Sequence, residues 1–224
     1  MNILIYGASG MVGQGVLREC LQAEDVESVT IAGRSVSPYQ HPKLRQIVMS
    51  DIAEAWGDSS SQFDACFFCL GVSASGMTED QYSKITFDLT LNIARRLAES
   101  NRKMTFIYVS GAGTDSTGKG RVMWARVKGK TENALLALGF DSALMFRPAV
   151  IQPLNGIESK TSSYRLFYRL AAPFFPVLRF IFLRSILTTG EMGNAMLNAV
   201  RYGSSKNILE MADISLLAKK RHHE

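Results

Sequence analysis

Three glycines near the start of the chain constrain the fold more than any other feature of the sequence. They stand three residues apart, after the apolar run 2–6 and before a segment with helical spacing. A glycine-rich turn of this kind lets the backbone come close to a phosphate, and the amino end of the helix supplies N–H groups and a positive dipole end. The pattern therefore predicts a pyrophosphate site for a dinucleotide. Its residues are Gly7, Ser9, Gly10, Met11, Val12 and Gly13.

Strand-like and helix-like segments alternate through the first two thirds of the chain. Such alternation produces a parallel sheet with helices on both faces. We therefore expect an α/β fold, a Rossmann-type doubly wound parallel sheet, in a single domain over 1–224. The expected strands are 2–6, 29–32, 45–49, 66–70, 105–109 and 143–146, and the expected helices are 11–22, 81–100 and 122–138.

The pattern changes after Pro148. Residues 149–190 are predicted to form a small helical C-terminal cap on the substrate side. Within this cap, 164–187 is apolar and aromatic with interspersed arginines. Three interpretations stay open for it: a substrate lid, a hydrophobic core under a loop, or an oligomer or peripheral membrane contact. A helix is expected at 191–202, and 208–219 stays undecided.

The charge balance excludes some partners. The 25 Lys and Arg exceed the 20 Asp and Glu, and part of the excess lies in 219–224. We interpret it as solvated surface. Because no basic stripe with interleaved aromatics is present, nucleic acid is not an expected partner. No metal site is expected either. A small-molecule substrate is the expected partner, and a monomer or homodimer the expected assembly.

The three cysteines indicate a reducing compartment rather than a disulfide framework. Cys66 and Cys69 have redox-pair spacing, but they fall in a strand-like run, where positions i and i+3 face opposite sides. We interpret both as core residues. The first strand begins at once, so no signal peptide is predicted, and we expect a soluble cytoplasmic protein.

The residues after the second expected strand bear on the choice of dinucleotide. Sites that prefer NAD place a carboxylate there to hold the ribose 2′-hydroxyl. This chain has Arg34 followed by Ser35. A guanidinium can bind a 2′-phosphate and stack on adenine. The sequence therefore favours NADP, with NAD as the alternative if Arg34 only caps a loop.

Further motifs extend the pattern over nearly the whole chain. They are Gly-x-x-Gly-x-x-Gly at 7–13, Cys-Leu-Gly-Val-Ser at 69–73, Val-Ser-Gly-Ala-Gly at 109–113, Trp-x-x-x-Lys at 124–128 and Phe-Arg-Pro at 146–148. Together they resemble the extended and atypical short-chain dehydrogenase/reductase superfamily. Within it, the chain is similar to the small NAD(P)-binding, NAD-dependent epimerase/dehydratase-like members, the group of the Tat-interacting protein 30.

The resemblance implies roles for individual residues. Ser110 would orient a substrate, and Lys128 would hold the nicotinamide ribose. The cofactor would be lined further by Asp51, Ile52, Leu70, Gly71, Val72 and Pro148.

One position departs from the superfamily pattern. Trp124 stands where the superfamily carries its catalytic Tyr, and an indole N–H does not titrate in water. A general acid or base must release and regain a proton near the working pH. Trp124 is therefore packing, a stacking platform or a degenerate catalytic position. Tyr164 or Tyr168 from the apolar segment, or a water held by Ser110 and Lys128, are candidate replacements.

Two functions follow as hypotheses. The first is an NADP-dependent oxidoreductase, or an epimerase/dehydratase-like enzyme, that acts on a small carbonyl or sugar-derived substrate. The second is a non-catalytic dinucleotide sensor or partner-binding protein that has lost the catalytic Tyr.

Overall fold

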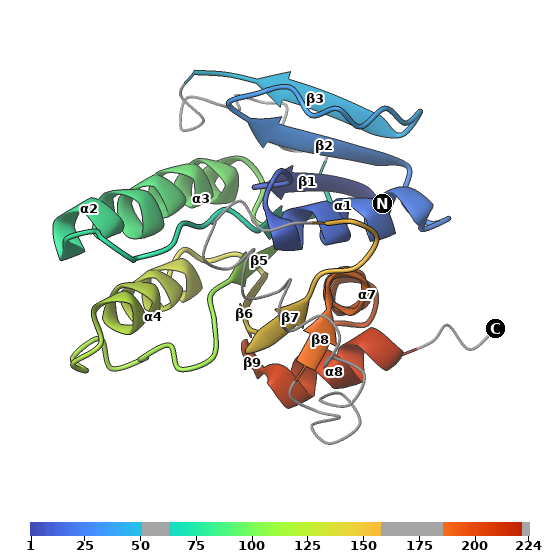
Figure 1. Ribbon diagram of the computed structural model, residues 1–224. Helices are drawn as coiled ribbons and strands as arrows, with labels where there is room; N and C mark the ends of the chain where they lie inside the picture. The colour runs from blue at the N-terminus through green and yellow to red at the C-terminus, as the bar shows by residue number, and fades with distance from the viewer. Residues whose placement is uncertain (51–62, 158–185, 221–224) are drawn as a thin grey trace.

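The computed structural model describes residues 1–50, 63–157 and 186–220. In this part of the chain, seven strands form one parallel sheet in the order β3-β2-β1-β4-β5-β6-β9 (Figure 1). From β1 the chain adds strands first on one side (β2, β3) and then on the other (β4, β5, β6 and β9), as in a doubly wound fold. The predicted fold class is confirmed. The strands are β1 (Asn2–Tyr6), β2 (Ser28–Gly33), β3 (Leu44–Val48), β4 (Ala65–Phe68), β5 (Thr105–Val109), β6 (Ser142–Arg147) and β9 (Ile208–Glu210).

Helices cover both faces of the sheet (Figure 1). On one face, α1 (Met11–Gln22) packs against α7 (Thr189–Tyr202), which in turn packs against α8 (Met211–Lys219). The other face carries the continuous helical run of α2 (Glu79–Ser83), η2 (Lys84–Asp88) and α3 (Leu89–Ser100), together with α4 (Met123–Leu136). The helices cover the two faces of the sheet, so the carboxyl ends of the strands are the place where a ligand is expected to bind.

The strands read as apolar runs because both of their faces are buried. On β1, Ile3 and Ile5 join the core under α1 and α7, whereas Leu4 and Tyr6 join the core under α3 and α4. The same alternation recurs on β4, where Phe67 and its neighbour Phe68 enter opposite cores. Burial of both faces fixes the register of each strand, since a one-residue slip would exchange the two cores.

Several predicted elements differ in detail. The predicted helix 81–100 begins earlier, at Glu79, because Thr78 and Gln81 form a capping box, and it contains a π-helical turn at 84–88. Short strands β7 (Val150–Gln152) and β8 (Ile186–Thr188) pair in parallel beside the main sheet and were not predicted. The undecided segment 208–219 forms β9 and α8.

The predicted helical cap falls only in part among the described residues. Its central part, 158–185, lies outside the described residues, and so do Tyr164 and Tyr168. The described parts of 149–190 form β7, a turn, β8 and the first two residues of α7. Ile151 and Leu187 join the core under α1 and α7, so this strand pair packs on that side of the main sheet.

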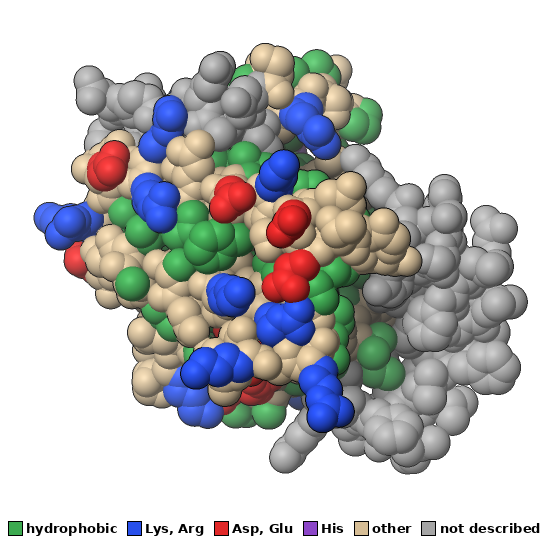
Figure 2. All heavy atoms as spheres, turned by 90° about the vertical axis from the view of Figure 1, so that its left-hand side faces the viewer, with side chains coloured by type: hydrophobic (Ala, Val, Ile, Leu, Met, Phe, Trp, Pro, Cys, Tyr) green, Lys and Arg blue, Asp and Glu red, His purple; other side chains and the backbone are tan. Residues whose placement is uncertain are grey.

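In the ranges that the structure describes, no helix is both long and apolar enough to cross a bilayer. Figure 2 shows the face that carries α2 and α4, where Lys and Arg side chains lie among Asp and Glu rather than in one basic stripe. One such pair joins Arg126 of α4 to Glu79 of α2 at 2.5 Å.

Candidate dinucleotide site

The turn between β1 and α1 leaves backbone N–H groups available to an anion. Gly7 has a φ of +79°, and its carbonyl accepts a 2.9 Å hydrogen bond from the Gly10 N–H. The first helical bond joins Gln14 N–H to the Gly10 carbonyl, so the N–H groups of Met11, Val12 and Gly13 have no partner within the helix. The first turn of α1 contains no acidic residue. The arrangement fits a pyrophosphate.

Two of the three glycines are required by close backbone contacts. A Cβ atom on Gly7 would lie 2.5 Å from the Leu70 main-chain nitrogen, and one on Gly13 would lie 2.2 Å from the Gly7 carbonyl oxygen. A Cβ on Gly10 would meet only the Gly7 oxygen, at 3.3 Å. Gly10 therefore presents an open backbone surface, which is where a phosphate can come close. Ser9 beside it is exposed.

The loop after β4 adjoins this turn. Its contact with Gly7 places Leu70 beside the glycines, and Gly71 and Val72 that follow are exposed. The structure therefore brings these three predicted cofactor residues to the same edge of the sheet as the glycine turn. Pro148 lies at this edge too, because its carbonyl accepts a 2.8 Å hydrogen bond from Ala112 N–H in the loop after β5.

Arg34 and Ser35 follow β2 directly, and both are exposed. Arg34 forms no hydrogen bond or ion pair with any residue that the structure describes, so its guanidinium is available for a ligand phosphate. Asp51 and Ile52, the other predicted adenine-side residues, lie outside the described residues.

Ser110 has a different environment from the one that the sequence suggested. It is buried, and its hydroxyl donates a 2.5 Å hydrogen bond to Glu132 Oε1 and lies 3.2 Å from the Phe146 carbonyl. Glu132 is fully buried and accepts hydrogen bonds from Arg147 Nε at 3.0 Å and Arg147 Nη2 at 2.5 Å. The Ser110 hydroxyl is thus committed to a buried ion pair rather than directed at a substrate.

Arg147 has further partners at the end of β6. Its Nη1 donates to Glu210 at 3.0 Å, and its Nη2 also donates to the Ser116 hydroxyl at 2.6 Å. Arg147 is part of the Phe-Arg-Pro motif and Glu132 follows the Trp-x-x-x-Lys motif, but sequence reasoning gave neither a role. The available signal was the position of Glu132 four residues after Lys128, on the same face of α4.

Lys128 and Trp124 approach the same edge from α4. The Lys128 ammonium donates a hydrogen bond to the Ser110 main-chain carbonyl. A Cβ on Gly129 would lie 1.7 Å from the Asp115 carbonyl oxygen, so glycine there lets α4 sit against the loop after β5. The Trp124 indole packs beside Gly113, since a Cβ on that glycine would lie 3.7 Å from Trp124 Cη2.

Burial changes the acidity of Lys128. Loss of hydration disfavours the charged amine and lowers its pKa to about 8, although the Glu132 carboxylate acts in the opposite direction. Among the described residues, the tyrosines near Lys128 offer no substitute acid. Tyr82 and Tyr108 are both buried in the core on that side, and burial raises the pKa of Tyr108 far above its usual range.

The cysteines behave as core residues. Cys66 belongs to the core under α3 and α4, whereas Cys69 packs against the opposite core. Burial raises the pKa of Cys69 to about 12 and the pKa of Cys66 well above its usual value. Thiols in this state are poor nucleophiles.

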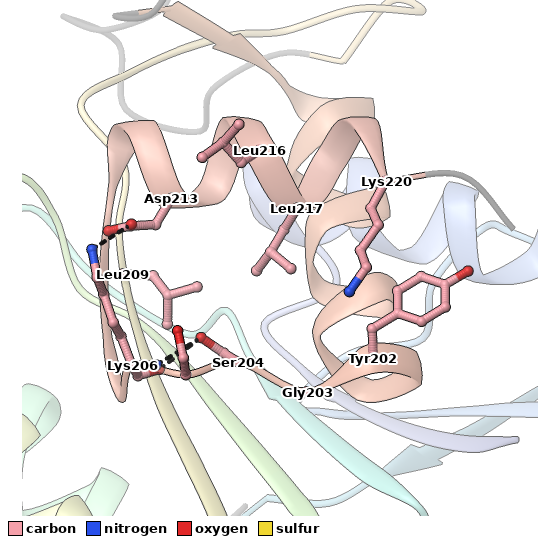
Figure 3. A pocket seen from close by; sticks show the side chains of 10 residues that line it. Tyr202, Gly203, Ser204, Lys206, Leu209, Asp213, Leu216, Leu217 and Lys220 are labelled. Carbon is pink, nitrogen blue, oxygen red and sulfur yellow. Dashed lines mark hydrogen bonds and ion pairs between the residues drawn. The ribbon is translucent and has the colours of Figure 1, made fainter. Parts of the chain in front are cut away.

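A surface hollow of about 450 Å³ lies elsewhere, between the loop before β9 and α8 (Figure 3). Lys206 pairs with Asp213 on one side of it, and Lys220 lies over the Tyr202 ring on the other. The loop precedes β9, so the hollow opens at the amino ends of the strands. The glycine turn, Arg34 and Ser110 all follow strands, at the opposite edge.

Comparison with known proteins gives a family match and curated relatives. Residues 3–120 match the NAD dependent epimerase/dehydratase family. The mitochondrial protein fmp52-2 of Aspergillus terreus is 29% identical over 153 residues, which cover 66% of each chain. The mitochondrial protein fmp52 of Emericella nidulans is 30% identical over 159 residues, which cover 67% of this chain and 66% of that one. The chain thus spans about two thirds of the length of these relatives.

Solved structures share the fold at low sequence identity. UDP-glucuronic acid 4-epimerase from Bacillus cereus, in complex with NAD, superposes with a TM-score of 0.68 and 12% identity over 94% of this chain and 76% of that one. A short-chain dehydrogenase/reductase from Saccharomyces cerevisiae superposes with a TM-score of 0.66 and 14% sequence identity. The match covers 97% of this chain and 98% of that one. The resemblance inferred from the motifs is therefore confirmed.

The expected cytoplasmic location is contradicted by the same relatives, which are named as mitochondrial proteins. The expectation used a low cysteine count and an early first strand. A low cysteine count reflects only reducing conditions and does not separate one reducing compartment from another.

Proposed function

This chain belongs to the NAD-dependent epimerase/dehydratase family, and we propose that it binds NADP in preference to NAD and uses it in oxidoreduction of a small carbonyl or sugar-derived substrate. One observation carries the proposal: the glycine turn at Gly7–Gly13 offers three unpaired helix N–H groups with no acidic residue in the first turn. A dinucleotide bound there supplies or accepts a hydride. Lys128 and Pro148 border the place where the nicotinamide end would lie.

The preference for NADP rests on Arg34. Its exposed guanidinium follows β2 and has no partner among the described residues. A carboxylate at this place would repel a 2′-phosphate, whereas Arg can form charge-assisted hydrogen bonds with it. Solved neighbours such as the Bacillus cereus epimerase are described as NAD complexes, so binding of both dinucleotides has to be compared directly.

Two measurements test the proposal. Calorimetric titration of the purified protein should give a dissociation constant for NADPH at least about tenfold below that for NADH, as one charge-assisted phosphate contact provides. Oxidation of NADPH in the presence of a panel of small aldehydes, ketones and keto sugars should then identify substrates. Equal affinity for the two dinucleotides would refute the NADP preference, and no binding of either would refute the whole proposal.

A second candidate is a non-catalytic dinucleotide sensor. The observation in its favour is that Trp124 cannot titrate and the Ser110 hydroxyl is committed to Glu132. A sensor would bind NADPH and oxidise it with no member of the panel. A Trp124→Tyr variant that gains reductase activity absent from the parent would support the sensor, and turnover by the parent would exclude it.

A further inference from the structure

Among the described residues, the edge of the sheet formed by the carboxyl ends of the strands lacks an obvious proton-transfer group. Reduction of a carbonyl delivers a hydride to carbon and requires a proton for oxygen. Trp124 holds its only N–H proton permanently near neutral pH. The Ser110 hydroxyl donates to Glu132 at 2.5 Å and is buried. Two tyrosines near β5, Tyr82 and Tyr108, are described, and both are buried in the core, away from a substrate.

We propose that Lys128 itself transfers the proton between substrate oxygen and solvent, in the place of the absent tyrosine. The inference rests on the proposed oxidoreductase function. Lys128 lies one helical turn after Trp124 on the same face of α4, and its amine reaches the carboxyl end of β5, where it donates to the Ser110 carbonyl. An ammonium has three N–H donors, so this bond leaves others for a substrate.

The surroundings of Lys128 hold the amine in place without fixing its charge. From β5 it meets the neutral Ser110 carbonyl. From its own helix it feels Glu132, whose carboxylate is already bound to Ser110 and to Arg147 of β6. Desolvation outweighs the attraction of that carboxylate and lowers the pKa of Lys128 to about 8. An amine with this pKa exists in both protonation states near neutral pH.

The proposed step balances in atoms and charge. A reduced nicotinamide dinucleotide held at the glycine turn would supply a hydride to the carbonyl carbon, and the electron pair of the C=O π bond would move to the oxygen. The Lys128 ammonium releases one proton to that oxygen, which forms the alcohol and leaves Lys128 as a neutral amine. The amine then takes a proton from water. In the reverse direction, the neutral amine accepts the hydroxyl proton of the alcohol.

Lys128→Arg tests this role because it keeps a cation and several donors but cannot release a proton near neutral pH. Dinucleotide affinity, measured by calorimetry on the same variant, separates any loss of ribose binding from the loss of proton transfer. Single-turnover hydride transfer should fall by about 100-fold or more, as expected for loss of a general acid. Lys130→Arg, on the exposed side of the same helix, is the matched control and should keep the wild-type rate.

Two pH-dependent readouts complete the test. The wild-type reduction rate should decline above pH 8, and Lys128→Arg should lack that decline. Independently of turnover, acetylation of the intact protein followed by peptide mass spectrometry should show half-maximal reactivity of Lys128 near pH 8, against about 10.4 for free lysine.

Each outcome supports or overturns a defined statement. Wild-type turnover that persists undiminished in Lys128→Arg overturns the role of Lys128 and leaves the proposed function intact. Half-maximal acetylation of Lys128 near pH 10.4, about the value for free lysine, also overturns that role. A wild type that binds dinucleotide but reduces no carbonyl overturns both the proposed oxidoreductase and the role of Lys128.

Discussion

The Ser110 hydroxyl and the Glu132 carboxylate lie 2.5 Å apart in the buried space between β5 and α4. The same carboxylate is bound by Arg147 from β6. An ion pair removed from water is stabilising only when its charges and hydrogen-bond groups are satisfied. Ser110 supplies one of the required donors. We therefore expect these residues to contribute to the folding stability of the protein rather than to the reaction itself.

Glu132→Gln should destabilise the protein strongly. The substitution keeps the shape of the side chain but leaves the Arg147 charge in a buried position without its main partner. Removal of one member of a buried pair costs about 3–5 kcal/mol of the free energy of unfolding. Urea denaturation followed by circular dichroism measures this change.

A double variant keeps this prediction testable if Glu132→Gln does not fold. Glu132→Met combined with Arg147→Met removes both charges and should be much more stable than the single variant. Lys206→Met, which breaks the more exposed Lys206–Asp213 pair, should change the free energy of unfolding by less than about 1 kcal/mol. A Glu132→Gln protein as stable as Lys206→Met would contradict the argument.

Lys128 should make stability depend on pH in the alkaline range. Its pKa is lowered in the folded protein to about 8, whereas an unfolded lysine titrates near 10.4. Between these values the unfolded chain binds more protons, so stability rises with pH. Below pH 8 the cost of burying the charged amine is fully present. Lys128→Met should therefore be more stable than the wild type at pH 7, by about 1–3 kcal/mol.

The advantage of Lys128→Met should shrink as pH rises from 8 to 10. Urea denaturation of both proteins across this range gives the difference, in which the titration of other groups largely cancels. A constant difference between the two proteins from pH 7 to pH 10 would show that the Lys128 amine is not desolvated.

Two substitutions in the glycine turn should affect dinucleotide binding and thermal stability differently. Gly10→Ala places a methyl group 3.3 Å from the Gly7 oxygen, a contact that small shifts can relieve, but it covers the surface offered to phosphate. Gly13→Ala places the methyl group 2.2 Å from that oxygen and must displace the turn. Gly10→Ala should weaken dinucleotide binding by about tenfold or more with little change in Tm, whereas Gly13→Ala should also lower Tm.

Calorimetry and thermal denaturation on the two variants check this separation. An equal loss of Tm in both would mean that Gly10 serves the packing of the turn rather than a ligand. Unchanged binding by Gly10→Ala would place the pyrophosphate elsewhere.

The sequence predicted the elements that are specified by local pattern. The bounds of β1, α1 and β5 match the prediction because each is a buried apolar run or an amphipathic segment with clear ends. β7, β8 and β9 were not predicted because each has only three residues, too few for a periodic signal. The orientation of Ser110 was also missed. It depends on Glu132, which is 22 residues away, and on Arg147 from the next strand, and only the folded sheet brings them together.

Arg34 provides the sharpest test of cofactor choice. Arg34→Gln removes the exposed cation after β2 without adding a negative charge. The dissociation constant for NADPH should rise by about tenfold to 100-fold, as loss of a charge-assisted phosphate contact predicts, while that for NADH should change little. Arg34→Glu should go further and favour NADH, because its carboxylate repels the 2′-phosphate and can accept a bond from the ribose 2′-hydroxyl. Arg95→Gln on the exposed face of α3 is the control. If both dinucleotides weaken equally in Arg34→Gln, the guanidinium contacts a group that they share, such as adenine, and the NADP preference has no basis in Arg34.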